Sequence, residues 1–169
     1  MKLRIAALAL LASSTIAFAE TKTIVDIAVG SADHTTLVAA VQAAGLAETL
    51  SGAGPFTVFA PTNEAFAKLP EGTVDGLLKP ESKDALTKIL TCHVVGAQAL
   101  AADVVKMVGD GGGTAMVDTL GGCKLSVTLD GGMVKITDEA GGTATVTAAD
   151  LTGSNGVIHV IDAVLLPAS

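Results

Sequence analysis

The chain contains no tyrosine and no tryptophan, and its only arginine is Arg4. Its aromatic content is four phenylalanines, and the spacing of Phe56, Phe59 and Phe66 favours a core cluster over an exposed platform. Side chains that stack on the bases of single strands are therefore missing. The 17 acidic residues outnumber the 10 basic ones, and such a charge repels a phosphate backbone. Nucleic acid is excluded as an expected partner.

The first 19 residues have the order of a cleavable signal peptide. Lys2 and Arg4 give a positive start, Ile5–Leu11 is apolar, and Ala17-Phe18-Ala19 forms a small-x-small cleavage site before Glu20. The apolar stretch is shorter than the roughly 20 residues that a spanning helix needs. Export with cleavage is favoured over an uncleaved anchor. We expect a bacterial, periplasmic or secreted protein with no stable membrane insertion after cleavage.

The mature chain is predicted to be one domain, residues 20–169. Its length suits a single hydrophobic core. Eight lysines and 17 acidic residues give it a formal charge of −9.

The only cysteines are Cys92 and Cys123, and neither has the C-x-x-C spacing of a redox centre or metal knuckle. In an exported chain a disulfide is favoured, and two buried free thiols are the alternative. Closing this loop would stabilise the fold by about 3 to 4 kcal/mol.

The first half of the mature chain is predicted to be mainly helical. Apolar residues recur at i, i+3 and i+4, and a short strand is expected at Phe56–Ala60. The expected N-caps are Thr62 and Asp33, with Ser31 or Thr35 in place of Asp33 if the helix boundary shifts. The expected helices are Thr23–Ser31, 37–44, Leu46–Leu50, Asn63–Leu69, Val74–Leu78 and Ser82–Thr91.

The second half is rich in valine, threonine and paired glycines, which predicts β-hairpins. Leu125 and Val127 should face the core while Ser126 and Thr128 face water. The expected strands are Ala115–Thr119, Lys124–Leu129, Met133–Thr137, Thr143–Ala148 and an interior strand Val157–Leu165. Helices followed by strands indicate an α+β domain.

Two segments, Phe56–Phe66 and Asn155–Asp162, with Cys92–Val95 between them, are the most specific part of the sequence. Together they resemble the fasciclin domain, and the resemblance covers residues 23–167. It implies a wedge of two β-sheets flanked by several helices. Its structural signature falls on Thr57, Phe59, Pro61, Thr62, Phe66, Asn155, Gly156, His159 and Asp162.

The three histidines, His34, His93 and His159, each stand alone, without a second ligand at metal-binding spacing. No metal and no cofactor are expected. A histidine inside an apolar strand is most often held by a buried hydrogen bond, and the resemblance implies that His159 orders the sheet. His93 stands where the family usually has a tyrosine of an adhesive tyrosine–histidine pair. This departure weighs against carrying over the role of that pair and turns the position into a possible disulfide anchor, while His93 itself is kept as an adhesion candidate.

No motif predicts an enzyme. The glycine-rich segment Asp110–Thr114 lacks the Lys-Ser/Thr ending of a phosphate loop, and there is no G-x-S-x-G elbow. Ser126 or Ser154 near His159 and Asp162 is a coincidence of composition, because neighbouring strand residues alternate faces.

The preferred binding candidate is Asp150-Leu151. In animal fasciclin domains an Asp-Ile pair at this point is implicated in receptor-mediated adhesion, and the resemblance implies the same role here. The alternative is that Asp150 caps a turn while Leu151 packs inward. We therefore expect a non-enzymatic binding domain that contacts a cell-surface protein or matrix component. The alternative function is a small-ligand carrier in the periplasm, which needs an apolar pocket between helices and sheet.

Overall fold

The computed structural model describes residues 22–168, so the expected signal peptide lies outside the described residues. Helices dominate the first half and strands the second, as predicted. The helices are α1 Ile24–Val29, α2 Thr35–Ala44, α3 Ala47–Ser51, α4 Asn63–Ala67, α5 Thr73–Leu77, α6 Lys83–Thr91 and α7 Ala101–Asp110, with short 3-10 turns at Ala32–His34 and Pro80–Ser82. The strands are β1 Phe56–Pro61, β2 Val94–Val95, β3 Thr114–Asp118, β4 Lys124–Asp130, β5 Met133–Thr137, β6 Thr143–Gly153 and β7 Gly156–Ile161.

Helix α7 lies in a stretch for which the sequence predicted no element. Val104 and Val108 lie one turn apart, and both are buried. Asp103 in the first turn accepts a hydrogen bond from the backbone N–H of Leu100 at 3.2 Å. This i, i+4 pair after an acidic residue was the available signal.

The predicted cap at Thr62 is confirmed, because its hydroxyl accepts a hydrogen bond from the N–H of Ala65 at 3.2 Å. The predicted cap at Asp33 is wrong. Instead, the side-chain Oδ1 of Asn63 accepts the N–H of Thr36 at 3.0 Å, so a residue 27 positions later in the chain caps the start of α2. Tertiary structure supplies here the acceptor that the local sequence was expected to give.

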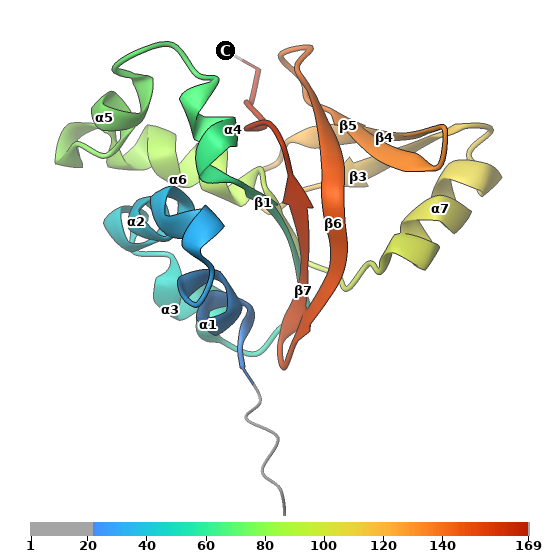
Figure 1. The fold of residues 1–169 in the computed structure, drawn as a ribbon, viewed down its shortest axis with the longest axis horizontal. Helices are drawn as coiled ribbons and strands as arrows, with labels where there is room; N and C mark the ends of the chain where they lie inside the picture. The colour runs from blue at the N-terminus through green and yellow to red at the C-terminus, as the bar shows by residue number, and fades with distance from the viewer. Residues whose placement is uncertain (1–21, 169) are drawn as a thin grey trace, which may run out of the picture.

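The seven strands follow the order β2-β1-β7-β6-β5-β4-β3. The long strand β6 pairs with β5 through residues 143–145 and with β7 through residues 146–153, so it joins two β-sheets (Figure 1). Helices α1 to α6 lie on one side of β1 and β7, and α7 lies on the other, beside β3 and β4. This is the expected α+β wedge.

Each face of the β1–β7 pair contributes to a separate core. Val58 and Ile158 are paired in register and pack with helices α1 to α6. Phe59 and Ile161 face the opposite way and pack with α7 and strands β3 to β5. Strand β7 is buried throughout, as predicted for an interior strand, but it ends at Ile161 rather than Leu165. A strand buried on both faces is apolar on both faces, which explains its sequence.

The segments next to the two outermost strands of this order, β2 and β3, lie close together. Cys92 and Cys123 form a disulfide, and both residues are buried. Close by, the N–H of Leu120 donates to the carbonyl oxygen of Val94 in β2 at 2.8 Å. The favoured disulfide is thus present, and it ties the end of α6 to the start of β4. None of the helices within residues 22–168 has both the length and the apolar character needed to cross a membrane.

Candidate functional site

Asp150 lies in a bulge of β6. The pairing with β7 shifts register between Val146 and Ala148 and again between Ala148 and Leu151. Asp150 has φ of 59°, in the left-handed region that few residues other than glycine adopt. Aspartate tolerates this conformation better than most side chains. The bulge leaves Asp150 exposed at the surface.

The carboxylate of Asp150 holds the start of α7. Its Oδ1 accepts a hydrogen bond from the backbone N–H of Ala101 at 2.8 Å. An acid at this position also interacts favourably with the helix dipole. Among the described residues, Oδ2 of Asp150 has no hydrogen-bond partner. Asp150 therefore caps a distant helix, which differs from the local turn that the sequence suggested.

His159 and Thr57 hold the segment that leads into α7. His159 Nε2 lies 2.7 Å from the carbonyl oxygen of Ala99, and its Nδ1 lies 3.4 Å from the N–H of Asp150. The ring thus donates at Nε2 and accepts at Nδ1. The N–H of Ala99 donates to the Thr57 hydroxyl at 2.8 Å. The His159 ring also stacks on Phe59, with centroids 5.8 Å apart.

Leu151 follows Asp150 and remains 39% exposed, although its backbone pairs with Ile158. It does not pack inward, as the alternative to a binding role required. The neighbouring positions of β6 from Thr147 to Thr152 are all exposed. An exposed acid and an accessible aliphatic side chain therefore follow one another in β6, and we call this pair the Asp150–Leu151 face.

His93 lies in the interior with 2% of its surface exposed. Its Nδ1 donates to the carbonyl oxygen of Ile89 at 2.8 Å, and its Nε2 accepts the N–H of Leu165 at 2.9 Å. Burial lowers the pKa of His93 to about 4, and the hydrogen bond to Ile89 and the charge of Asp138 oppose that shift. A buried, fully bonded ring cannot touch a partner, which corrects the expectation of a contact role for His93.

Asn155 ties the β6–β7 turn to the helices. Its Oδ1 accepts the N–H of Ile24 at 3.0 Å, and its Nδ2 donates to the carbonyl oxygens of Leu50 at 2.6 Å and Gly52 at 2.9 Å. The next residue, Gly156, must be a glycine, because a Cβ there would lie 2.2 Å from the carbonyl oxygen of Phe56. The remaining signature residues, Pro61, Phe66 and Asp162, are buried or half-buried.

Catalytic arrangements built on His159 do not form, because backbone groups occupy both of its ring nitrogens. Within residues 22–168, no group of three or more histidine, cysteine or acidic side chains gathers in a way that could hold a metal ion.

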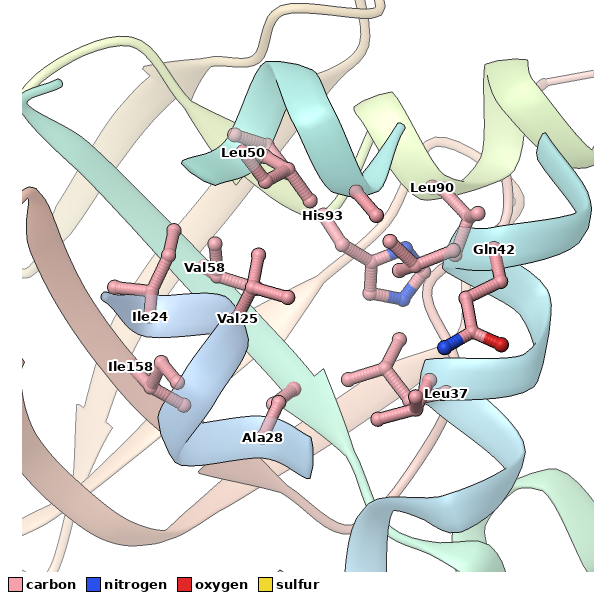
Figure 2. A pocket seen from close by; sticks show the side chains of 15 residues that line it. Ile24, Val25, Ala28, Leu37, Gln42, Leu50, Val58, Leu90, His93 and Ile158 are labelled. Atoms are coloured by element: carbon pink, nitrogen blue, oxygen red, sulfur yellow. The ribbon is translucent and has the colours of Figure 1, made fainter. Parts of the chain in front are cut away.

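The chain also contains an apolar cavity of about 50 Å³ between helices α1, α2 and α3 and the strands β1 and β7 (Figure 2). Val25 and Ala28 of α1 form one wall, and Val58 and Ile158 form the floor. The lining includes two polar side chains, Gln42 and His93. The helices that line this cavity lie on the side of β1 and β7 opposite to α7 (Figure 1).

Comparison with known proteins decides the family. The model of the fasciclin domain matches residues 32–167. Protein sll1483 of Synechocystis sp. is 52% identical over 145 residues, which cover 86% of this chain and 73% of that protein. The chain belongs to the fasciclin family. The resemblance carried by the two signature segments is therefore confirmed.

Other fasciclin relatives contain the matched region within longer chains. Transforming growth factor-beta-induced protein ig-h3 of Sus scrofa is 39% identical over 145 residues, which cover 86% of this chain and 19% of that protein. Among solved structures, a FAS1 domain pair from the insect cell adhesion molecule fasciclin I has a TM-score of 0.76 at 20% identity, covering 86% of this chain and 51% of that one. At that identity the structural likeness shows the fold alone.

Proposed function

We propose that this fasciclin domain is a non-enzymatic binding domain of the periplasm or cell exterior that contacts a cell-surface protein or a matrix component. Insect fasciclin I, which shares the fold, is a cell adhesion molecule, and this supports a role of the same class. The observation that carries the proposal is the Asp150–Leu151 face, because it combines an exposed aliphatic side chain with an acid.

The face suits recognition by a partner that bears a cation. A carboxylate oxygen can complete the coordination of a partner-bound Ca²⁺ or Mg²⁺, and the neighbouring leucine can fill an apolar pocket. The Asp150 bond to Ala101 fixes the carboxylate in place, which reduces the entropy lost on binding.

The test is attachment of bacterial cells to a surface coated with the mature domain. Asp150→Asn keeps an acceptor for Ala101 and tolerates the left-handed backbone while it removes the charge. Leu151→Thr removes the aliphatic contact and suits a strand. Leu120→Thr is the matched control, because Leu120 is also an exposed leucine, at 51%.

We expect attachment to fall at least fivefold for Asp150→Asn and for Leu151→Thr, and to remain unchanged for Leu120→Thr. If cells attach equally to the wild type and to all three variants, each shown to be folded, the contact lies elsewhere than on this face. Failure of bacterial cells to attach to a surface coated with the wild-type domain would reject adhesion.

Carriage of a small ligand is the alternative function, and the apolar cavity is the observation in its favour. We further propose that the mature protein is the single domain 20–169. The mass and N-terminal sequence of the exported protein test this, and an N-terminus other than Glu20 would contradict it.

A further inference from the structure

We propose that the cavity between α1, α2, α3 and the β1–β7 pair binds the chain of a neutral, single-chain lipid such as a long-chain alcohol. The inference rests on the alternative function, ligand carriage, and is independent of adhesion. The Asp150–Leu151 face borders α7, whereas the cavity lies on the other side of β1 and β7.

The lining selects an uncharged apolar group. Thirteen of its fifteen residues are apolar, and none carries a formal charge at neutral pH. His93 contributes a ring whose two nitrogens are already bonded to Ile89 and Leu165. Water in such a space would find few hydrogen-bond partners, and apolar cavities of this kind stay dry. An alkyl chain has no hydrogen bonds to lose on entering and would gain van der Waals contacts.

The size of the cavity limits the occupant to a slender chain. Its volume of about 50 Å³ is a third of the roughly 150 Å³ that accommodates benzene in an engineered apolar cavity. The space exists because alanines line it at positions 28, 47 and 60. In the present conformation only a chain end fits, so a longer chain requires one wall to move.

Helix α1 is the wall that can move. Two hydrogen bonds anchor its start. The carbonyl oxygen of Lys22 accepts the N–H of Ser154 at 2.8 Å, and the N–H of Ile24 donates to Asn155 Oδ1 at 3.0 Å. Among the described residues, later hydrogen bonds of α1 stay local, and Val29 at its end is 58% exposed. The next anchor along the chain is the carbonyl oxygen of Ala32, which accepts a hydrogen bond from Asn63 Nδ2 at 3.0 Å, so the six residues of α1 between these two anchors are the part of the wall that can shift. That shift would carry Val25 and Ala28 outward and lengthen the cavity.

Gln42 supplies the polar end of the site. It is exposed, it projects from α2 at the edge of the cavity, and its amide can donate and accept (Figure 2). A hydroxyl or carbonyl head group at the mouth fits this amide. The formal charge of −9 on the mature chain disfavours a carboxylate head, so a neutral alcohol should bind better than a fatty acid.

The experiment titrates 1-dodecanol into the mature protein and follows the methyl resonances of alanine, valine and leucine by NMR. We expect saturable shifts confined to residues around the cavity, including Ala28, Leu37 and Val38. Laurate should bind at least tenfold more weakly. Ala28→Leu fills the cavity and should reduce dodecanol affinity at least tenfold. Ala39→Leu on the exposed side of α2 is the matched control and should bind as wild type.

Ala47→Leu provides a second filling variant if Ala28→Leu does not fold. Absence of saturable shifts in the wild type would overturn the proposal, as would equal binding by wild type and the filled variant. Asp150→Asn must bind dodecanol as wild type does. Loss of adhesion in that variant with unchanged dodecanol binding, or the reverse pattern for Ala28→Leu, separates the failure of one function from that of the other.

Discussion

Asp150 Oδ1 accepts the backbone N–H of Ala101 at 2.8 Å, across 49 residues of sequence. The acid proposed to meet a partner therefore also positions the start of α7. Substitutions at Asp150 can act through the surface or through the helix, and the two effects are separable because asparagine preserves the bond geometry while alanine does not.

The first prediction is that Asp150→Ala destabilises the domain by about 1 to 2 kcal/mol. Alanine removes the cap of α7 and must adopt the left-handed φ of 59° without a side chain that favours it. Asp150→Asn should remain within about 0.5 kcal/mol of wild type. Urea denaturation followed by far-UV circular dichroism measures both. Equal stability of the alanine variant would show that the Ala101 bond contributes nothing.

The second prediction concerns the disulfide. Cys92 and Cys123 are 31 residues apart, and opening that loop should cost about 3 to 4 kcal/mol through the entropy of the unfolded chain. A Cys92→Ala, Cys123→Ala double variant should lose this amount in urea denaturation. Adding reductant should not change the double variant further. A denaturation midpoint equal to that of the oxidised wild type would contradict the prediction.

The third prediction is a loss of stability in acid that originates at His93. Its pKa is about 4 in the folded state, because burial disfavours the imidazolium, and about 6.5 in the unfolded chain. Above pH 6.5 both states are neutral and the residue contributes no pH dependence. Between pH 6.5 and 4 the unfolded state binds the proton that the folded state refuses, so stability should fall by about 3 kcal/mol.

His93→Gln is the control for this pH effect, because an amide can donate to Ile89 and accept from Leu165 but does not titrate. The slope of unfolding free energy between pH 6.5 and 4 should become markedly shallower in that variant. Burial also lowers the pKa of His34, so a smaller slope should persist. An unchanged slope would mean that His93 is not the group responsible. The surface carboxylates with lowered pKa values, Asp26, Asp130 and Glu139, also lose stabilising interactions as the pH falls, and because His93→Gln leaves them unchanged, the comparison with wild type isolates His93.

Local patterns predicted most of the elements correctly. The alternation of Leu125 and Val127 with Ser126 and Thr128 is a property of one strand, and the structure buries the first pair and half-exposes the second. Thr62 could be assigned as a cap because donor and acceptor are three residues apart.

Long-range relationships were not predictable in this way. The side chain of Asn63 caps the start of α2 by bonding to a residue 27 positions away, and that of Asp150 caps the start of α7 by bonding to a residue 49 positions away. Nothing in the sequence around Asp150 signals a bulge, because the shift arises from pairing with β7. The contact role of His93 was suggested by its place in the family's tyrosine–histidine pair, and not by its neighbours, which bury it. The roles of Asn63 and Asp150 are set by hydrogen-bond partners that lie far away in the sequence.

The fourth prediction tests the anchor of α1. Asn155 bonds to Ile24 at the start of α1 and to Leu50 and Gly52 around the end of α3. Asn155→Ala leaves three backbone groups without their partner and should destabilise the domain by about 3 kcal/mol. Asn155→Asp keeps the acceptor but turns a charge toward two carbonyl oxygens, so it should be at least as destabilising.

Gln98→Ala is the matched control for Asn155, since Gln98 is an exposed amide lining the same open hollow and should tolerate the change within about 0.5 kcal/mol. Hydrogen exchange gives the local readout, because the amide of Ile24 loses its acceptor only in Asn155→Ala. Its exchange should accelerate at least tenfold, while the amides of β1 and β7 change only as much as global stability does. Uniform acceleration would show that Asn155 supports the whole fold and not α1 in particular. If hydrogen exchange at the Ile24 amide does not accelerate, Asn155 does not anchor the start of α1, and the proposed movement of α1 loses its support.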